Sequence, residues 1–196
     1  MVSEKVPVRG LRFKSVTSRE WEDLEKLFGP RGACSGCWCM WWRLTRAEFE
    51  RQKGDENRHA LKALIDSGVV PGILAYFEDH PVGWCSIGPR ETYPILEHSR
   101  SLKRVDDEPV WSIVCFFVAK AFRRRGIMSE LVKAAVSHAR ANGARIIEAY
   151  PVDTVNEKYP DIFAYTGLFL TFRDAGFIEV IRRSKSRPIV RFYIGN

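Results

Sequence analysis

The hydrophobic pattern changes most clearly between residues 110 and 142. An almost unbroken apolar run, Val110–Val118, is followed by a polar turn, and from Ile127 onward apolar residues recur at helical spacing. A run that is apolar on both faces is typical of a central strand covered on both sides, and the helical spacing indicates an amphipathic helix. This segment therefore predicts a buried strand, a tight turn and a helix packed on the sheet.

The residues that follow complete a strand–helix–strand unit. Asn142-Gly143 predicts the end of the helix, and the apolar positions of Ala144–Tyr150 predict another strand. Two strands joined through one helix by short loops should be parallel, with a right-handed crossover.

Strand patterns also occur on both sides of this unit. Glu78-Asp79-His80-Pro81 separates two of them and predicts a hairpin turn. The further predicted strands are Leu11–Val16, Ile73–Phe77, Val82–Ile87, Phe177–Arg183 and Ile189–Ile194.

Two capping boxes predict helix starts in the first third of the chain. Thr17 with Glu20, and Thr45 with Glu48, have the spacing at which each side chain bonds the other residue's backbone N–H. The predicted helices run from the first box through Phe28, from the second box to an interruption near Gly54, from Asp55 to Ser67, and over Phe163–Ala175. Tyr93–Val105 is predicted to be irregular or briefly helical.

The turn between the central strand and its helix carries Arg123, Arg124 and Arg125, followed by Gly126. Cations at a helix N-terminus are disfavoured by about 0.3–1 kcal/mol each, so stability alone would not place them there. They are favourable if an anion docks at the turn, where backbone N–H groups can hold a phosphate. Gly126 allows the backbone a close approach or a positive φ. A solvated basic turn is the plainer interpretation, but the strand–turn–helix context favours a phosphate site.

These residues resemble motif A of the GNAT acetyltransferases, written Q/R-x-x-G-x-G/A. Arg123 holds the first position and Gly126 the fourth, whereas Met128 departs from the Gly or Ala of the sixth. In that family the loop binds the pyrophosphate of acetyl-CoA. The resemblance therefore implies acetyl-CoA as cosubstrate, with binding residues in the turn and at the end of the central strand. They are Phe116, Phe117, Val118, Arg123, Arg124, Arg125, Gly126, Ile127, Met128 and Ser129.

The same resemblance implies the fold. It predicts an α/β (α+β) chain with one central, mixed and mostly antiparallel sheet, a parallel βαβ unit at motif A and helices on both faces. The 196 residues fit a single domain over 1–196, and an apolar content of 45% is enough for a core of ordinary size.

The last third of the chain also resembles the family, where a helix ends in Tyr-x-x-x-Gly-Phe. Gly176-Phe177 matches, but Phe172 stands where the family often has the tyrosine that protonates the departing CoA thiolate. A phenyl ring has no proton to give. Tyr165, two helical turns earlier on what should be the same helix face, is the nearest replacement. A packed tyrosine and a proton supplied by water are the alternatives.

The chemistry implied by the resemblance is direct transfer of the acetyl group to an amine. The amine must lose a proton, so a base or a water chain is needed. Glu148, Glu91 and Asp107 are the candidate bases, with an ion pair as the alternative for each. In the family, backbone N–H groups of the central strand hold the oxyanion, here within Phe116–Val118. Cys115 is expected to be a core residue.

Cys34, Cys37 and Cys39 form a C-x-x-C-x-C cluster. A closed zinc site needs four ligands, and no second C-x-x-C supplies the fourth, so no metal is expected. A Cys34–Cys37 disulfide under oxidation is an alternative, but packing as core or pocket wall is the favoured interpretation. By the resemblance, nearby tryptophans are the candidate walls of the acceptor site. These are Trp38, Trp41, Trp42 and Trp84.

Charge and composition narrow the function further. The net charge of +7 suits a polyanionic ligand, and no helix-turn-helix, zinc finger or RNP-like motif supports a nucleic-acid partner. No apolar run reaches the length of about 20 residues that a membrane span needs, no signal peptide is evident, and five cysteines do not form a disulfide framework. A cytoplasmic protein without membrane contact is expected, and a homodimer is compatible with the resemblance.

Two functions remain from this sequence. The first is an acetyl-CoA-dependent N-acetyltransferase acting on a primary amine of a small molecule, an amino sugar or a protein. The second is a non-catalytic acyl-CoA-binding or sensor module of the same fold, which the phenylalanine at position 172 keeps open.

Overall fold

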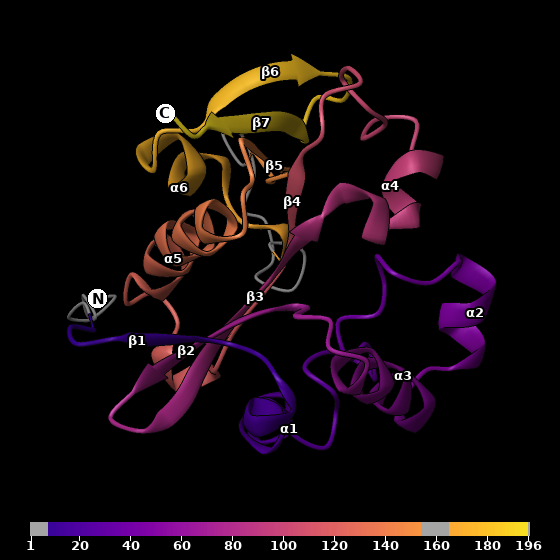
Figure 1. Ribbon diagram of the computed structural model, residues 1–196, viewed down its shortest axis with the longest axis vertical. Coiled ribbons are helices and arrows are strands. Elements are labelled where there is room, and N and C mark those ends of the chain that lie inside the picture. The colour runs from indigo at the N-terminus through magenta and orange to yellow at the C-terminus, as the bar shows by residue number, and fades with distance from the viewer. Residues whose placement is uncertain (1–7, 154–164, 196) are drawn as a thin grey trace, which may run out of the picture.

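Strands from both halves of the chain meet in one sheet in the computed structural model, which describes residues 8–153 and 165–195 (Figure 1). The sheet has seven strands in the order β1-β2-β3-β4-β5-β7-β6. The strands are β1 (Arg12–Ser15), β2 (Gly72–Phe77), β3 (His80–Pro89), β4 (Trp111–Val118), β5 (Ile146–Ala149), β6 (Ile178–Arg182) and β7 (Pro188–Tyr193).

The pairing of these strands is antiparallel throughout except between β4 and β5, which are parallel. The helix α5 (Ile127–Ala141) connects those two strands. The mixed sheet and the parallel strand–helix–strand unit predicted from the sequence are therefore confirmed.

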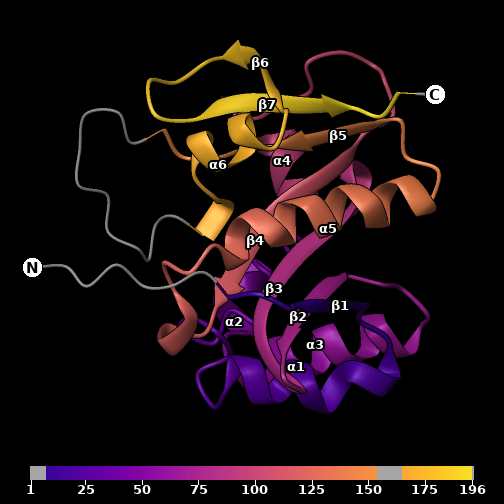
Figure 2. The same cartoon turned by 90° about the vertical axis from the view of Figure 1, so that its left-hand side faces the viewer.

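Helices cover both faces of the sheet (Figures 1 and 2). As a result, successive residues of β2 and β3 are buried although they point to opposite faces. Trp84 of β3 packs with α1 and α3, whereas its neighbour Cys85 belongs to the core under α5. Successive strand residues point to opposite faces, so one strand contributes to both cores. The other helices are α1 (Trp21–Phe28), α2 (Arg46–Arg51), α3 (Asp55–Asp66), α4 (Pro94–His98) and α6 (Phe169–Asp174).

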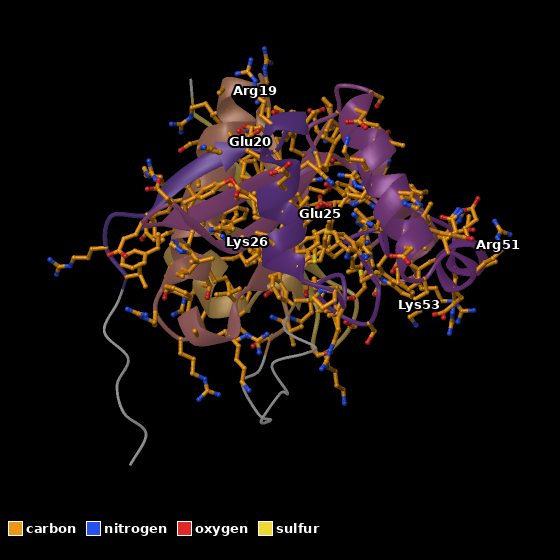
Figure 3. All side chains as sticks on the ribbon, turned by 90° about the horizontal axis from the view of Figure 1, so that it is seen from below. Arg19, Glu20, Glu25, Lys26, Arg51 and Lys53 are labelled. Atoms are coloured by element: carbon orange, nitrogen blue, oxygen red, sulfur yellow. The ribbon has the colours of Figure 1, made fainter. Side chains whose placement is uncertain are left out.

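Both predicted capping boxes are present. The side chain of Thr17 accepts from the Arg19 N–H while Glu20 reaches back to the Thr17 N–H, and Thr45 and Glu48 repeat the arrangement at the start of α2. The first box opens a short 3-10 turn that leads into α1. Figure 3 looks onto this outer surface, where Arg19 and Arg51 extend away from the molecule.

The last helix is shorter than the sequence indicated. We predicted a helix over 163–175, of which residues 163 and 164 lie outside the described residues, but α6 begins only at Phe169. Gly167 has a φ of +89° and Leu168 is extended, pairing with Val152 in an isolated bridge. Tyr165 therefore lies before the helix, and the predicted shared face with Phe172 is wrong.

The parallel pair β4–β5 separates part of the way along β4. Its last paired positions are Ile113 of β4 and Ala149 of β5, whereas β4 continues to Val118. On the other side, Ser86 and Ile87 of β3 face Cys115 and Ile113, so Val114 is an extra, bulged residue. The bulge lies where β5 leaves β4, and beyond it no strand of the described residues pairs with that edge of β4.

Candidate active site

The turn at the start of α5 has the geometry of an anion site. Gly126 caps the helix in the left-handed region with a φ of +78°, and Arg124 is also left-handed at +59°. The first N–H groups of an α-helix have no partner within the helix. The Nε of Arg123 donates to the carbonyl of Val118 over 3.1 Å, which ties the turn to the end of β4.

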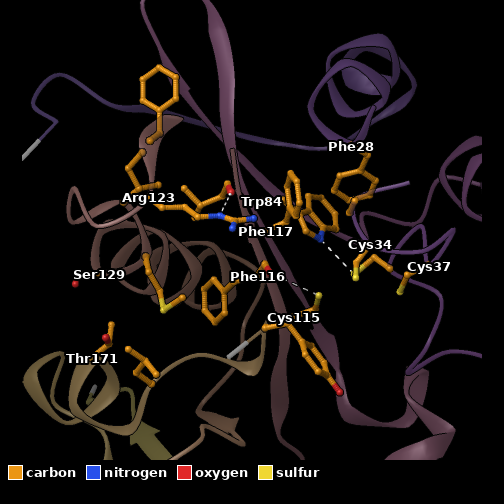
Figure 4. A pocket seen from close by; sticks show the side chains of 18 of the residues that line it. Phe28, Cys34, Cys37, Trp84, Cys115, Phe116, Phe117, Arg123, Ser129 and Thr171 are labelled. Atoms are coloured by element: carbon orange, nitrogen blue, oxygen red, sulfur yellow. Dashed lines mark hydrogen bonds between the residues drawn. The ribbon is translucent and has the colours of Figure 1, made fainter. Parts of the chain in front are cut away.

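This turn opens into a cavity of about 790 Å³. The cavity follows the open edge of β4 at Phe116–Val118 and ends in a chamber walled by aromatic and cysteine side chains. In Figure 4, Arg123 and Ser129 lie toward one end and Phe28, Cys34 and Cys37 toward the other. We call the second end the aromatic chamber; its described walls are Phe28, Ala33, Cys34, Cys37, Cys39, Trp41, Phe49, Trp84, Cys115 and Tyr165.

All of the predicted cofactor-binding residues except one line the cavity. The exception is Arg125, whose guanidinium lies 5.5 Å from the ring centre of Phe122 and whose carbonyl accepts the Val8 N–H. Arg123 and Arg124 are the charged residues among its described walls. The cavity is therefore cationic at the turn and apolar at the chamber.

The four predicted acceptor tryptophans are divided between the cavity and the core. Trp41 and Trp84 line the chamber. Trp38 is buried against Trp21 and Phe28. The fourth, Trp42, is buried beside Tyr165, with ring centres 6.4 Å apart. Trp38 and Trp42 pack behind the wall residues, and neither is among the described residues that line the cavity.

The predicted bases do not reach the described walls of the cavity. Glu148 is fully buried in an ionic network under the sheet, with Oε1 2.8 Å from Nη1 of Arg90 and Oε2 2.9 Å from Nε of Arg191. Glu91 and Asp107 are exposed on connecting segments. The structure brings none of the three carboxylates to the chamber.

Tyr165 does line the cavity, although not from the predicted helix face. Burial raises the pKa of its hydroxyl, and the guanidinium of Arg187 lies 6.0 Å from its ring centre. Phe172 is fully buried between Phe116 and Phe177. The ring of Phe172 thus fills the core beside β4 and presents nothing to the cavity.

Cys39 and Cys115 are chamber residues for which packing was the favoured interpretation of the sequence. The indole Nε1 of Trp84 donates to the Cys39 sulfur over 3.2 Å. The thiol of Cys115, which lies 3.9 Å from the Phe116 carbonyl oxygen, is the neighbour that most lowers the pKa of Cys39, against the opposing effect of burial. Burial raises the pKa of Cys37 to about 11. The C-x-x-C-x-C spacing identified this segment as unusual, but nothing in the sequence indicated that it packs against β4.

No metal site is evident within residues 8–153 and 165–195, where no three His, Cys, Asp or Glu side chains are grouped to hold an ion. The five cysteines are free thiols. Among the described helices, none is long and apolar enough to cross a membrane.

Comparisons with known proteins agree with this geometry. The profile of the acetyltransferase (GNAT) family matches residues 38–159, well over half of the chain. No curated protein sequence matches.

Solved structures share the fold at low sequence identity. A PaiA N-acetyltransferase from Thermoplasma acidophilum in complex with coenzyme A is 10% identical, with a TM-score of 0.54 over 94% of this chain and 99% of its own. An acetyltransferase of the GNAT family from Listeria monocytogenes is 10% identical, with a TM-score of 0.57 over 94% and 95%. An N-acetyltransferase from Staphylococcus aureus is 11% identical, with a TM-score of 0.53 over 94% and 98%. With its family profile, its mixed sheet and its basic turn at the start of α5, this chain belongs to the GNAT acetyltransferase family.

Proposed function

We propose that this protein transfers an acetyl group from acetyl-CoA to a primary amine. The observation that carries the proposal is the single cavity that joins the basic turn before α5 to the aromatic chamber. One end suits a polyanion and the other an organic acceptor, so one cavity has room for both reactants of an acyl transfer.

The basic turn fits the pyrophosphate of CoA. Its helix N–H groups and the guanidinium of Arg124 supply hydrogen bonds and positive charge. From there the pantetheine arm would follow β4 past Val118, where β5 no longer occupies the edge. The backbone groups of that edge are available to an extended arm in the way that strands bind peptides.

The chamber favours an acceptor with an apolar or aromatic body. Trp41, Phe49 and Trp84 offer ring surface, and the described walls carry no carboxylate that would bind a polycation or an amino sugar. An ammonium group can still be held over aromatic faces by about 0.5–2 kcal/mol. We therefore expect arylalkylamines to be better acceptors than polyamines.

The proposal is tested by calorimetric titration with CoA, followed by an assay of acetyl-CoA consumption against a panel of amines. Binding of CoA together with turnover of at least one amine supports a transferase. The buried Phe172, which offers no proton, favours the alternative of a non-catalytic acyl-CoA-binding module. Tight CoA binding without turnover of any arylalkylamine, polyamine, amino sugar or peptide would select that alternative.

A further inference from the structure

We propose that the sulfur of Cys39 is the base that removes the ammonium proton of the acceptor amine in the aromatic chamber. This inference rests on the proposed transferase function. It assigns a catalytic residue to a segment for which packing was the favoured interpretation of the sequence.

The reaction needs a base that the expected carboxylates do not supply. An alkylamine with a pKa of about 10.4 is protonated at neutral pH and cannot attack a thioester until it loses a proton. Glu148, Glu91 and Asp107 lie elsewhere, and the described walls of the chamber contain no carboxylate and no imidazole. The titratable groups of those walls are four cysteines and Tyr165.

Cys39 is the cysteine with the most complete set of hydrogen-bond donors. It is 5% exposed and lines the cavity, and its backbone has a φ of +58°. The indole N–H of Trp84 donates to its sulfur over 3.2 Å. The thiol of Cys115, on β4 next to the bulge at Val114, also lowers the pKa of Cys39. A hydrogen bond donated to a buried sulfur favours the thiolate.

The surroundings of Cys39 and Cys115 favour the thiolate on Cys39 rather than on Cys115. The pKa of Cys39 is lowered, whereas the pKa of Cys115 is raised by the neighbouring Cys39 sulfur and by burial. Between the two sulfurs, the proton therefore stays on Cys115. The titratable and charged groups that interact electrostatically with Cys39 within the described residues are Cys37, Arg43, Cys85, Tyr93 and Cys115, of which Cys85 lies in the core on the opposite face of the sheet. Of these, Arg43 is the cation, and it also lowers the pKa of Cys39.

The step balances without a further reactant. The Cys39 thiolate takes one proton from the ammonium, so an N–H bond breaks and an S–H bond forms. The free amine attacks the thioester carbonyl, the new C–N bond forms and the C–S bond to CoA breaks. The second N–H proton goes to the CoA thiolate, and Cys39 returns its proton to water. The products are the amide, CoA and one released proton.

The test compares two acceptors in Cys39→Ser, which keeps the size of the side chain but has no thiolate near neutral pH. An arylalkylamine is an ammonium at pH 7 and needs the base, whereas an aniline-type amine is already neutral and does not. With the first acceptor we expect kcat/KM to fall by about 10²–10⁴-fold. With the second, the loss should be at least ten times smaller (~1.4 kcal/mol).

A pH profile with the arylalkylamine gives an independent readout. In the wild type, kcat/KM should level off once Cys39 is a thiolate. In Cys39→Ser it should keep rising toward the pKa of the amine, about 10. The control is Cys85→Ala, which removes a cysteine of β3 that faces the other core, and it should keep the wild-type profile.

Equal losses for both acceptors, or an unchanged profile in Cys39→Ser, would show a structural role and overturn the inference. Detection of a kinetically competent acetyl group on Cys39 by rapid quench and mass spectrometry would also overturn it, because the sulfur would then be a nucleophile. Wild-type protein that binds CoA but turns over no member of the amine panel would reject the transferase function itself. If the wild type turns over both acceptors, the transferase function holds, and the results with Cys39→Ser then test the role of Cys39 alone.

Discussion

Arg90 and Glu148 form an ion pair inside the protein, with Nη1 2.8 Å from Oε1 and each side chain only 1% exposed. Arg191 binds the other carboxylate oxygen at 2.9 Å, and the Tyr150 hydroxyl donates to the first at 2.7 Å. Both carboxylate oxygens therefore accept hydrogen bonds from buried groups, and the two arginines hold β5 to its neighbours. A carboxylate in this setting stabilises the fold and is poorly placed to exchange protons with a substrate.

Glu148→Gln should accordingly lower stability before it affects chemistry. Removing one charge of a buried pair costs about 3–5 kcal/mol, because the partner charge is left buried. Chemical denaturation should show this loss, while kcat per folded molecule stays near wild type. Glu130→Gln, which removes an exposed pair with Lys133, is the surface control and should leave unfolding unchanged. Unaltered stability with lost turnover would restore Glu148 as a candidate base.

Stability should also depend on pH through His138 of α5. Burial lowers the pKa of this imidazole, and its Nδ1 lies 3.1 Å from the Ser15 hydroxyl. The unfolded chain, with a pKa of about 6.5, then binds a proton more readily than the folded one. The stability associated with the neutral, buried imidazole is therefore fully present above pH 6.5 and is lost as the pH falls toward the folded-state pKa. His138→Gln should flatten that part of the stability profile in denaturant titrations, and an unchanged slope would contradict the assignment.

Neighbouring arginines of the basic turn should differ in their effect on CoA. Arg124 lines the cavity, whereas Arg125 does not and lies over Phe122. A charge-assisted hydrogen bond is worth about 1.5–3 kcal/mol, so Arg124→Ala should raise the Kd for CoA by about 10–100-fold and reduce its salt dependence. Arg125→Ala is the matched control and should have a clearly smaller effect. Equal effects of the two variants would mean that the turn acts through its net charge alone.

The features that could be predicted from the sequence are those that depend on residues close together in the chain. The strand–turn–helix around Gly126 and the capping box at Thr17 rest on local spacing, and both are confirmed. The contact between Cys39 and Cys115 joins distant segments through the fold, so no periodicity could indicate it. The last helix begins later than predicted because Gly167 has a positive φ, which the helical spacing of the apolar residues around it did not indicate.

The indole N–H of Trp84 should set the reactivity of Cys39. Trp84→Phe keeps an aromatic ring but removes the donor that lies 3.2 Å from the sulfur. The thiolate loses a hydrogen bond, so its pKa should rise. The measurement is the pH dependence of iodoacetamide alkylation at Cys39, followed by peptide mass spectrometry. Trp41→Phe, another chamber residue, should leave that pKa unchanged, and the same shift in both variants would attribute the effect to altered packing.

Tyr165 bears on how the CoA thiolate obtains its proton. The residue lines the cavity, and its hydroxyl stays protonated because burial raises its pKa. Since the attacking amine carries a second proton that can pass directly to the leaving sulfur, a separate acid is not required. A thiol with a pKa of about 8.5 is also a tolerable leaving group near neutral pH.

We therefore expect Tyr165→Phe to lose far less than the factor of about 10²–10⁴ that a positioned acid contributes. The substitution keeps the ring against Trp42 and its contact with Arg187, so packing and acetyl-CoA affinity should be preserved. Steady-state kinetics with calorimetry on the same preparation separate the two effects. If kcat instead falls by two orders of magnitude or more while CoA binding is unchanged, Tyr165 is the acid despite lying outside the predicted helix. The proton of the leaving thiol would then come from the Tyr165 hydroxyl, because the second proton of the amine would not compensate for its removal.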